Sequence, residues 1–180
     1  LFTVLDFNGD TWQLCCRQEQ LRYCYTAIGR PVAAVTTYTA AVDPAGRLHL
    51  ILALKDRGLL YARWQGSQWL VDTLPRNGII LAFTLNSSGQ PHILLQDPAG
   101  KQTIHMYLTG SHWQQLSLPF RLAINPLLLQ PLTQDRMLLS GYSLNEKGQQ
   151  LFWTVYSPAN GWHASRFING HFPLQDTYIY

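Results

Sequence analysis

A turn phrase that occurs twice constrains the fold of this chain more than any other feature. The segments VDPAGRLHL (42–50) and LNSSGQPHI (85–93) each place Asp or Asn three residues before a Gly and His three residues after it. Each is followed by an apolar run, a polar turn, an aromatic-rich run and a G-x-x-W segment. Self-similarity at a regular spacing is typical of repeat architectures, so we expect a tandem array of one structural unit.

Two weaker copies flank this pair. Upstream, TVLDFNGDTWQLCC places Asp6 three residues before Gly9, and downstream PLTQDRMLLSGYS keeps the order of parts without the Gly or the His. The anchors at 9, 46, 89 and about 136 are 37 to 47 residues apart. This spacing matches that of β-propeller blades, which are about 40–50 residues long.

Each copy is predicted to contain four short strands. In the second copy these are Tyr38–Asp43, Leu48–Leu54, Leu59–Trp64 and Trp69–Leu74, all rich in aliphatic, aromatic or β-branched residues. No segment shows a sustained helical period. The run LHLILAL is apolar on both faces, which indicates a sheet packed between two neighbours.

We therefore expect an all-β fold, a β-propeller of four-stranded antiparallel blades with four blades visible. The approximate blade boundaries are 1–37, 38–77, 78–121 and 122–168, with 169–180 as a closing or next-blade strand. The chain is expected to be one domain, either a complete small ring or part of a larger one. A β-sandwich and a solenoid of β-hairpins are the alternatives.

The recurring acids, amides and glycines are predicted to shape turns. An Asp or Asn side chain can accept hydrogen bonds from the backbone two residues on, and Gly tolerates the positive φ that closes a reversal. We therefore expect Asp6, Asp43 and Asn86 to form turns, and likewise Asp135.

Composition excludes several classes of function. Only 13% of the residues are charged, the net charge is +3, and no basic run exceeds two adjacent residues, so a nucleic-acid partner is not expected. No apolar stretch has the roughly 18 residues of a membrane span. The chain opens on Leu1, so we expect a trimmed chain or a piece of a longer protein, and its localisation stays unknown.

The cysteines form no recognisable redox or metal motif. Cys15, Cys16 and Cys24 give neither a C-x-x-C pair nor an even disulfide set. Free, buried thiols are the expected state. A cross-strand contact from Cys24 to Cys15 or Cys16 is the alternative.

The blade phrase resembles the blades of bacterial sialidase-like propellers, including BNR-repeat proteins, over roughly 1–168. The likeness departs from that group in the turn, because LDFNGDTW separates Asp6 and Gly9 by two residues where the Asp-box has one. The resemblance implies a catalytic arginine cluster and a Tyr–Glu pair. Glu19 and Glu146 are the only glutamates, and both fall in predicted turns, so no active-site residue is transferred.

Other catalytic and metal constellations are also missing from the sequence. His49 and His92 occupy equivalent positions, but the two flanking copies have Trp12 and Leu138 there, so blade packing is favoured over metal ligation. There is no G-x-S-x-G elbow, no P-loop and no pair of carboxylates in a motif. We expect no cofactor, no metal and no catalytic residue.

Binding is the predicted use of such a ring. Arg76, Asn77 and Arg121 follow predicted outer strands on one face, where they could contact an acidic or hydroxylated ligand. Trp69 and Trp113 lie near the other face, where aromatic rings can stack on sugars. These five residues are the candidate ligand contacts.

The sequence thus predicts a non-catalytic binding or scaffolding module with a protein or glycan partner. A carbohydrate-binding, lectin-like module is one alternative, and a glycan-active enzyme of sialidase-like ancestry is another. An incomplete ring would leave an open strand edge, which predicts homo-oligomerisation or completion of the ring by another segment.

Overall fold

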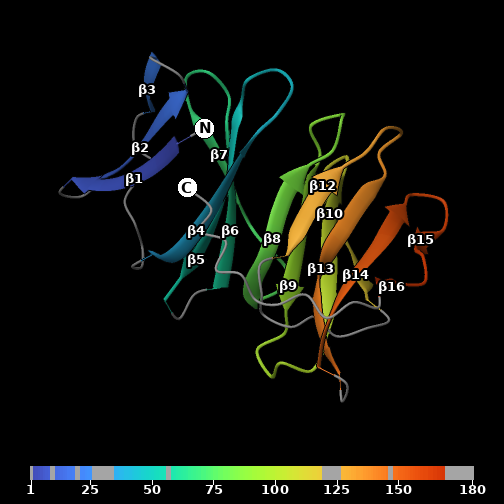
Figure 1. The fold of residues 1–180 in the computed structure, drawn as a ribbon. Coiled ribbons are helices and arrows are strands. Elements are labelled where there is room, and N and C mark those ends of the chain that lie inside the picture. The colour runs from blue at the N-terminus through green and yellow to red at the C-terminus, as the bar shows by residue number, and fades with distance from the viewer. Residues whose placement is uncertain are drawn as a thin grey trace.

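Every regular element in the described part of the chain is a β-strand (Figure 1). The structure, a computed structural model, describes the backbone of 2–8, 11–18, 21–25, 35–55, 58–118, 127–145 and 148–168, and side chains within 36–142 and 151–166 of these ranges. Within them, no helix is long and apolar enough to cross a membrane.

The strands form four separate antiparallel sheets, which we call blades I to IV. Blade I contains β1 (Phe2–Asn8), β2 (Thr11–Gln18) and β3 (Leu21–Tyr25), and blade II contains β4 (Val35–Val42), β5 (Leu48–Leu54), β6 (Gly58–Trp64) and β7 (Trp69–Thr73). Blade III contains β8 (Ile79–Leu85), β9 (Pro91–Gln96), β10 (Thr103–Thr109) and β11 (His112–Ser117). Blade IV contains β12 (Leu128–Pro131), β13 (Met137–Asn145), β14 (Gly148–Ser157), β15 (Gly161–Trp162) and β16 (Arg166–Ile168).

The four-stranded unit predicted from the repeat is confirmed in blades II and III, where consecutive strands pair in chain order. Blade I has three strands in its described part. In blade IV the outer strand is split, because β15 and β16 both pair with β14 and the residues between them leave the ladder. There the Thr154 hydroxyl donates to the His163 carbonyl at 2.7 Å, which holds the interruption in place.

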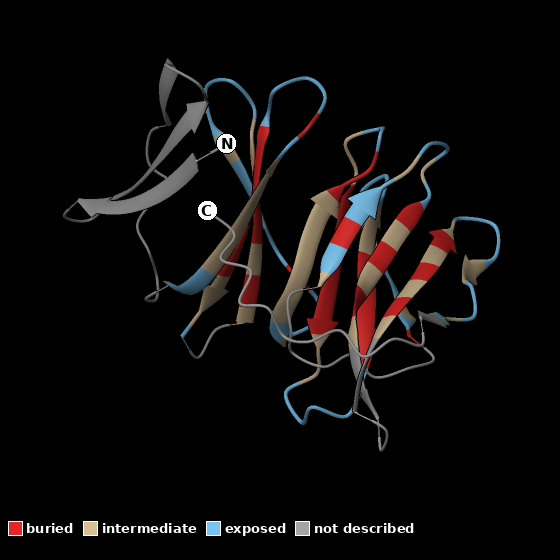
Figure 2. Cartoon of the chain, in the orientation of Figure 1, coloured by how far each residue is buried: buried red, intermediate tan, exposed pale blue. Residues whose placement is uncertain are grey.

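Blades II, III and IV stand side by side with their first strands innermost (Figure 1). Strand β8 lies next to both β4 and β12. Alternate residues of β9 therefore enter different cores: Ile93 packs with Ile51 of blade II, and Leu94 packs with Phe152 of blade IV. Burial on both faces of one sheet, visible in Figure 2, is the arrangement of a β-propeller.

The turns between the first two strands form as the sequence predicts. The Asp43 Oδ1 accepts hydrogen bonds from the backbone N–H of Ala45 at 2.9 Å and of Arg47 at 2.8 Å. In blade III the Asn86 Oδ1 accepts from the N–H groups of Ser88 at 3.1 Å and Gln90 at 2.8 Å. The predictions for Asp43 and Asn86 are confirmed, while the side chain of Asp6 falls outside the described residues.

These turns also contact one another across blades. The hydroxyls of Ser87 and Ser88 donate to Asp135 Oδ1 at 3.0 and 3.1 Å, which joins the turns of blades III and IV. Asp135 has a positive φ of 54°, as a turn residue can. The same ends of the inner hairpins of blades III and IV are thereby held together.

In blade I the register of β2 with β3 sets Cys15 directly opposite Cys24. The backbone therefore matches the cross-strand alternative for these two residues. The tail 169–180 and Arg121 lie outside the described residues.

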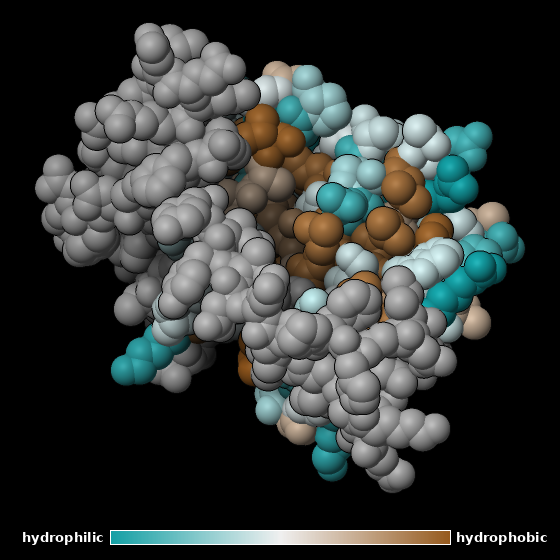
Figure 3. Space-filling model, viewed as in Figure 1, coloured by the Kyte–Doolittle hydropathy of each residue, from teal (hydrophilic) through white to brown (hydrophobic). Residues whose placement is uncertain are grey.

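Apolar surface gathers in the middle of the face seen in Figure 3. The exposed large apolar residues on the inner strands are Val42, Ile79 and Leu128. Because inner strands border the axis of a propeller, these three residues lie on the axial side of their blades.

We expect Gly78→Ala to destabilise the fold by about 2–3 kcal/mol, because a Cβ there would lie 2.4 Å from the backbone oxygen of Gln96. Gly66→Ala is the control: its φ is +85°, but a Cβ would meet nothing within 4 Å, so only about 1 kcal/mol of backbone strain is expected. Urea unfolding of both variants measures the difference. Equal losses would contradict the close approach of Gly78 to β9.

Candidate functional site: a seam between two blades

The face of blade II that meets blade III carries a cluster of polar and aromatic side chains, which we call the II–III seam. Tyr61 and Arg63 lie on this face of β6, and His49 of β5 stands directly opposite Arg63. Trp113 of β11 approaches from blade III and packs edge-on against Tyr61, with ring centroids 5.3 Å apart and planes at 85°. Two sheets thus contribute to one site.

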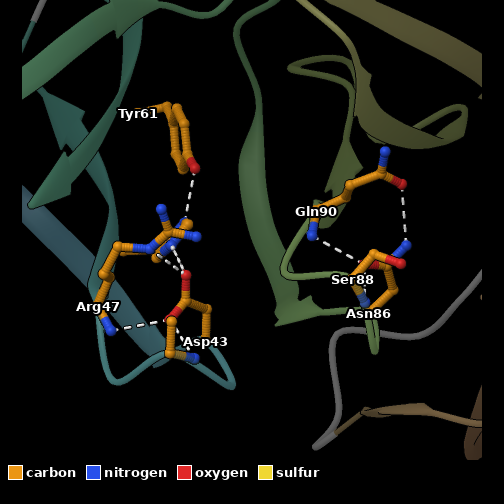
Figure 4. Close-up of polar contacts among 8 residues, drawn as sticks. Asp43, Arg47, Tyr61, Asn86, Ser88 and Gln90 are labelled. Carbon is orange, nitrogen blue, oxygen red and sulfur yellow. Dashed lines mark hydrogen bonds and ion pairs between the residues drawn. The ribbon is translucent and has the colours of Figure 1, made fainter. Parts of the chain in front are cut away.

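A chain of hydrogen bonds supports the seam from beneath (Figure 4). The Asp43 Oδ2 accepts from Arg47 Nε at 2.6 Å and lies 3.4 Å from His49 Nε2. The other ring nitrogen, His49 Nδ1, lies 2.6 Å from the Tyr61 hydroxyl. Because Asp43, His49 and Tyr61 are all at most 4% exposed, this chain is shielded from water.

The protonation states along this chain follow from burial and hydrogen bonding. Burial alone would raise the pKa of Asp43, but hydrogen bonds from Arg47 and His49 outweigh it and hold that pKa below its ordinary value. Burial lowers the pKa of His49, so the ring is neutral at pH 7. An ionised Asp43 accepts only, which assigns the His49 proton to Nε2 and makes the Tyr61 hydroxyl the donor to Nδ1.

Tyr61 is consequently a fixed hydrogen-bonding group. Burial raises its pKa to about 12, so the phenol is protonated at neutral pH. Its hydrogen is committed to His49, and the oxygen retains capacity to accept a hydrogen bond. This arrangement orients a phenol, and it does not generate a phenolate nucleophile.

Two buried N–H donors flank Tyr61 without a partner. Arg63 Nε and Trp113 Nε1 are both shielded from solvent, and neither makes a hydrogen bond within the described residues. Buried donors in native proteins are nearly always paired, and leaving one unpaired costs about 1–3 kcal/mol. The seam therefore presents two donors for which the described part of the chain supplies no acceptor.

The outer strand adds a carboxylate and an apolar contact on the same face. Asp72 of β7 stands directly opposite Tyr61, and Leu70 stands directly opposite Arg63. Both β7 residues are exposed, Leu70 by 36%. With donors, an acceptor and an apolar side chain together, the seam suits a ligand that has hydroxyl groups and an apolar face.

The seam between blades III and IV is built on the same plan, but there the tryptophan N–H is paired within the protein. His92 Nδ1 lies 3.0 Å from His105 Nε2, and Trp162 Nε1 donates to His105 Nδ1 at 3.2 Å. Trp162 and Tyr156 pack edge-on against His105 with centroids 5.3 and 4.7 Å apart. We call this cluster the III–IV seam.

Both histidines of the III–IV seam are neutral at pH 7. Burial lowers the pKa of His92 to about 4, against an opposing effect of Asp135, and burial lowers the pKa of His105 well below its ordinary value. Since Trp162 can only donate, His105 carries its proton on Nε2 and donates to His92 Nδ1. His92 then carries its proton on Nε2, which is buried without a partner in the described part.

Of the five predicted contact residues, two lie along the II–III seam. Trp113 packs on Tyr61, and Arg76 donates from Nε to Gln115 Oε1 at 2.9 Å. Gln115 is two residues beyond Trp113 on the same face of β11, about 7 Å along the strand. Trp69 instead packs edge-on against Trp64 at 5.3 Å, on the other face of blade II.

Asn77 lies near Gly58, at the end of blade II away from His49 and Arg63, beside a cleft of about 350 Å³. The cleft is lined by Thr36, Ala53, Leu54, Gly58, Leu59, Asn77 and Gly78. The Thr36 hydroxyl is bonded to the Ala53 carbonyl at 3.2 Å, so the lining offers a neutral, weakly polar surface.

Sequence reasoning missed Arg63, Tyr61 and Asp72. These residues belong to no motif, and the only available signal was their position in the repeat: Arg63 and Tyr107 occupy equivalent places in β6 and β10. Within the described residues, no group of three or more His, Cys, Asp or Glu side chains gathers as a metal site.

No protein-family model and no curated protein sequence matches this chain. Solved structures do match. A mutant of the Aleuria aurantia lectin in complex with Fucalpha1-6GlcNAc gives a TM-score of 0.62 at 13% identity, covering 96% of this chain and 58% of the lectin chain. The same lectin with alpha-methyl-L-fucoside gives a TM-score of 0.61, also at 13% identity, covering 96% and 57%.

A fucose lectin from Kordia zhangzhouensis in complex with methyl-fucoside gives a TM-score of 0.48 at 20% identity, covering 71% of this chain and 96% of that chain. At 13% identity, the Aleuria aurantia match shows the fold alone. The chain spans less than 60% of the length of that lectin. The β-propeller fold is thereby supported, without specific support for the sialidase-like group.

We expect the stability of the fold to fall as the pH falls from 6.5 towards 4. The folded-state pKa of His92 is depressed from 6.5 to about 4, so between these pH values the unfolded chain binds a proton at His92 and the folded chain does not. The lowered pKa values of His49 and His105 act in the same direction. Stability is full above pH 6.5, and His92 alone lowers the unfolding free energy by roughly 2–3 kcal/mol at pH 4.5, a loss to which His49 and His105 add.

Urea unfolding at pH 7.5, 6.0 and 4.5 measures this loss. The lowered pKa of Asp43 adds a further loss only as the pH falls below 3.8, which separates the two effects. His112→Gln, at an exposed position, should keep the wild-type pH dependence, whereas His92→Gln should reduce it to the part that His49 and His105 contribute. A wild-type unfolding free energy that is constant from pH 7.5 to 4.5 would contradict the neutral, buried histidines.

Proposed function

We propose that this chain is a carbohydrate-binding propeller module that takes a hydroxyl-rich ligand at the II–III seam. The observation that carries the proposal is a pair of buried donors without a described partner: Arg63 Nε, two residues from Tyr61 on the same face of β6, and Trp113 Nε1, whose ring packs on Tyr61. Sugar hydroxyls and ring oxygens supply the acceptors that these donors lack.

The chemistry of the neighbouring groups supports a sugar over other ligands. A hydroxyl can accept from Arg63 or Trp113 and donate to Asp72 or to the Tyr61 oxygen, so one diol satisfies donors and acceptors together. Trp113 and Leu70 offer apolar surface for the C–H face of a pyranose. A purely anionic ligand would leave the Asp72 carboxylate facing a like charge.

The structural neighbours make the proposal specific enough to test. The solved lectins with this fold are complexed with fucose-containing ligands, and alpha-methyl-L-fucoside is therefore the first ligand to test. The sequence left both a protein and a glycan open as the partner, and the proposal selects the glycan. It assigns no catalytic role to any residue.

We expect the protein to bind a subset of a glycan array, and Arg63→Gln to weaken that binding by about 10- to 100-fold, because it removes a charged hydrogen bond worth roughly 1.5–3 kcal/mol. Trp113→Phe keeps an aromatic ring but loses the N–H, so a loss of about 3- to 10-fold is expected. Isothermal titration calorimetry with the tightest array glycan and with alpha-methyl-L-fucoside measures both.

Trp162→Phe is the matched control, because Trp162 is the equivalent tryptophan of blade IV and its N–H is already bonded to His105. It should reduce stability and leave the affinity within about 2-fold of wild type. Arg76→Ala and Asn77→Ala test the two other predicted contacts. No binding to any glycan, or an unchanged affinity in Arg63→Gln, would refute the proposal, and a loss confined to Asn77→Ala would move the site to the cleft.

A further inference from the structure

The two seams can be compared position by position, because the strand registers align them. In blade II, His49 stands opposite Arg63, and Tyr61 stands opposite Asp72. In blade III, His92 stands opposite Tyr107, and His105 stands opposite Leu116. The equivalent pairs are therefore Arg63 with Tyr107, Tyr61 with His105, and Asp72 with Leu116.

The tryptophans of the following blades are equivalent as well. Trp113 stands opposite Leu108 near the start of β11, and Trp162 stands opposite Tyr156 in β15. Each packs edge-on against the strand residue of the preceding blade, Tyr61 in one case and His105 in the other, with centroids 5.3 Å apart in both. The seams share their geometry and differ in chemistry.

We infer that of these two seams only the II–III seam accepts a ligand, and that Tyr107, His105 and Leu116 close the III–IV seam. This inference rests on the proposed function and adds which residues decide where a ligand binds. It assigns one ligand to blades II–IV, although two seams have the same backbone arrangement.

Each of the three replacements removes one ligand-binding feature. Tyr107 puts a ring where Arg63 offers a guanidinium, and this ring packs into the core shared by blades III and IV. Leu116 packs on the same core where Asp72 offers an exposed carboxylate. No cation and no carboxylate therefore stands at the equivalent places of the III–IV seam.

His105 removes the third feature, the unpaired tryptophan N–H, by accepting a hydrogen bond from it. Its Nδ1 accepts the Trp162 N–H at 3.2 Å, whereas the equivalent Trp113 N–H has no acceptor among the described residues. Tyr61 does not play this part, because its hydroxyl points to His49 Nδ1 at 2.6 Å and makes no hydrogen bond with Trp113 Nε1. A histidine in place of a tyrosine thus turns an available N–H into a structural hydrogen bond.

The first test is to open the closed seam. The triple variant Tyr107→Arg, His105→Tyr and Leu116→Asp should bind one equivalent of alpha-methyl-L-fucoside more than the wild type by calorimetry. The reverse variant Arg63→Tyr with Asp72→Leu should bind one equivalent fewer than the wild type. A folded triple variant with the wild-type stoichiometry, or a wild type that loses an equivalent on Tyr107→Ala, would overturn the inference while leaving the proposed function intact.

The second test needs no ligand and covers a triple variant that fails to fold, or a wild type that binds no fucoside. In wild-type protein labelled with ¹⁵N-tryptophan, the Trp162 indole N–H should exchange with solvent at least 10-fold more slowly than the Trp113 N–H. In His105→Phe the Trp162 N–H should exchange at least 10-fold faster than in wild type. Equal protection of the two indoles in wild type would overturn the inference, because the Trp113 N–H would then be occupied too.

Discussion

The contact between a ring in the third strand of one blade and a tryptophan in the outer strand of the next is the interaction on which the structure depends. Tyr61 with Trp113 and His105 with Trp162 repeat it at the same centroid distance. A four-stranded sheet that is apolar on both faces cannot be stable alone, so each blade requires its neighbours. Edge-on aromatic contacts fix both the spacing and the orientation of successive sheets.

Polar groups beneath these rings determine which N–H donors are paired in each seam. Buried polar networks stabilise a unique arrangement only when every member is satisfied. In the II–III seam, the ionised Asp43 orients His49 and Tyr61, while the N–H donors of Arg63 and Trp113 have no acceptor among the described residues. In the III–IV seam, His105 accepts from the Trp162 N–H and donates to His92, whose Nε2 is the one buried ring nitrogen of the pair without a described partner. One scaffold thus produces a candidate binding site and a purely structural contact.

Much of the fold could be predicted because turn chemistry is local. Asp43 and Asn86 bond backbone groups within four residues of themselves, so their spacing in the sequence carries the information. Asp97 makes the same kind of turn, with Lys101 and Gln102 N–H donating to its Oδ1, in a DPAG tetrapeptide identical to residues 43–46. The candidate site was harder to predict, since Trp113 stood out as a repeated residue whereas Arg63 and Asp72 differ from their counterparts in blade III.

The sequence by itself determined the repeating four-stranded sheet, its turns and the burial of both faces, because these follow from side-chain periodicity and short-range hydrogen bonds. Only the tertiary structure decided which copies of the repeat meet and whose donors are left without acceptors. Arg63 and Trp113 are fifty residues apart in the chain, and pairing or its absence depends on where a neighbouring sheet places its side chains. A hydrogen bond between blades is a property of their packing, which no single repeat contains.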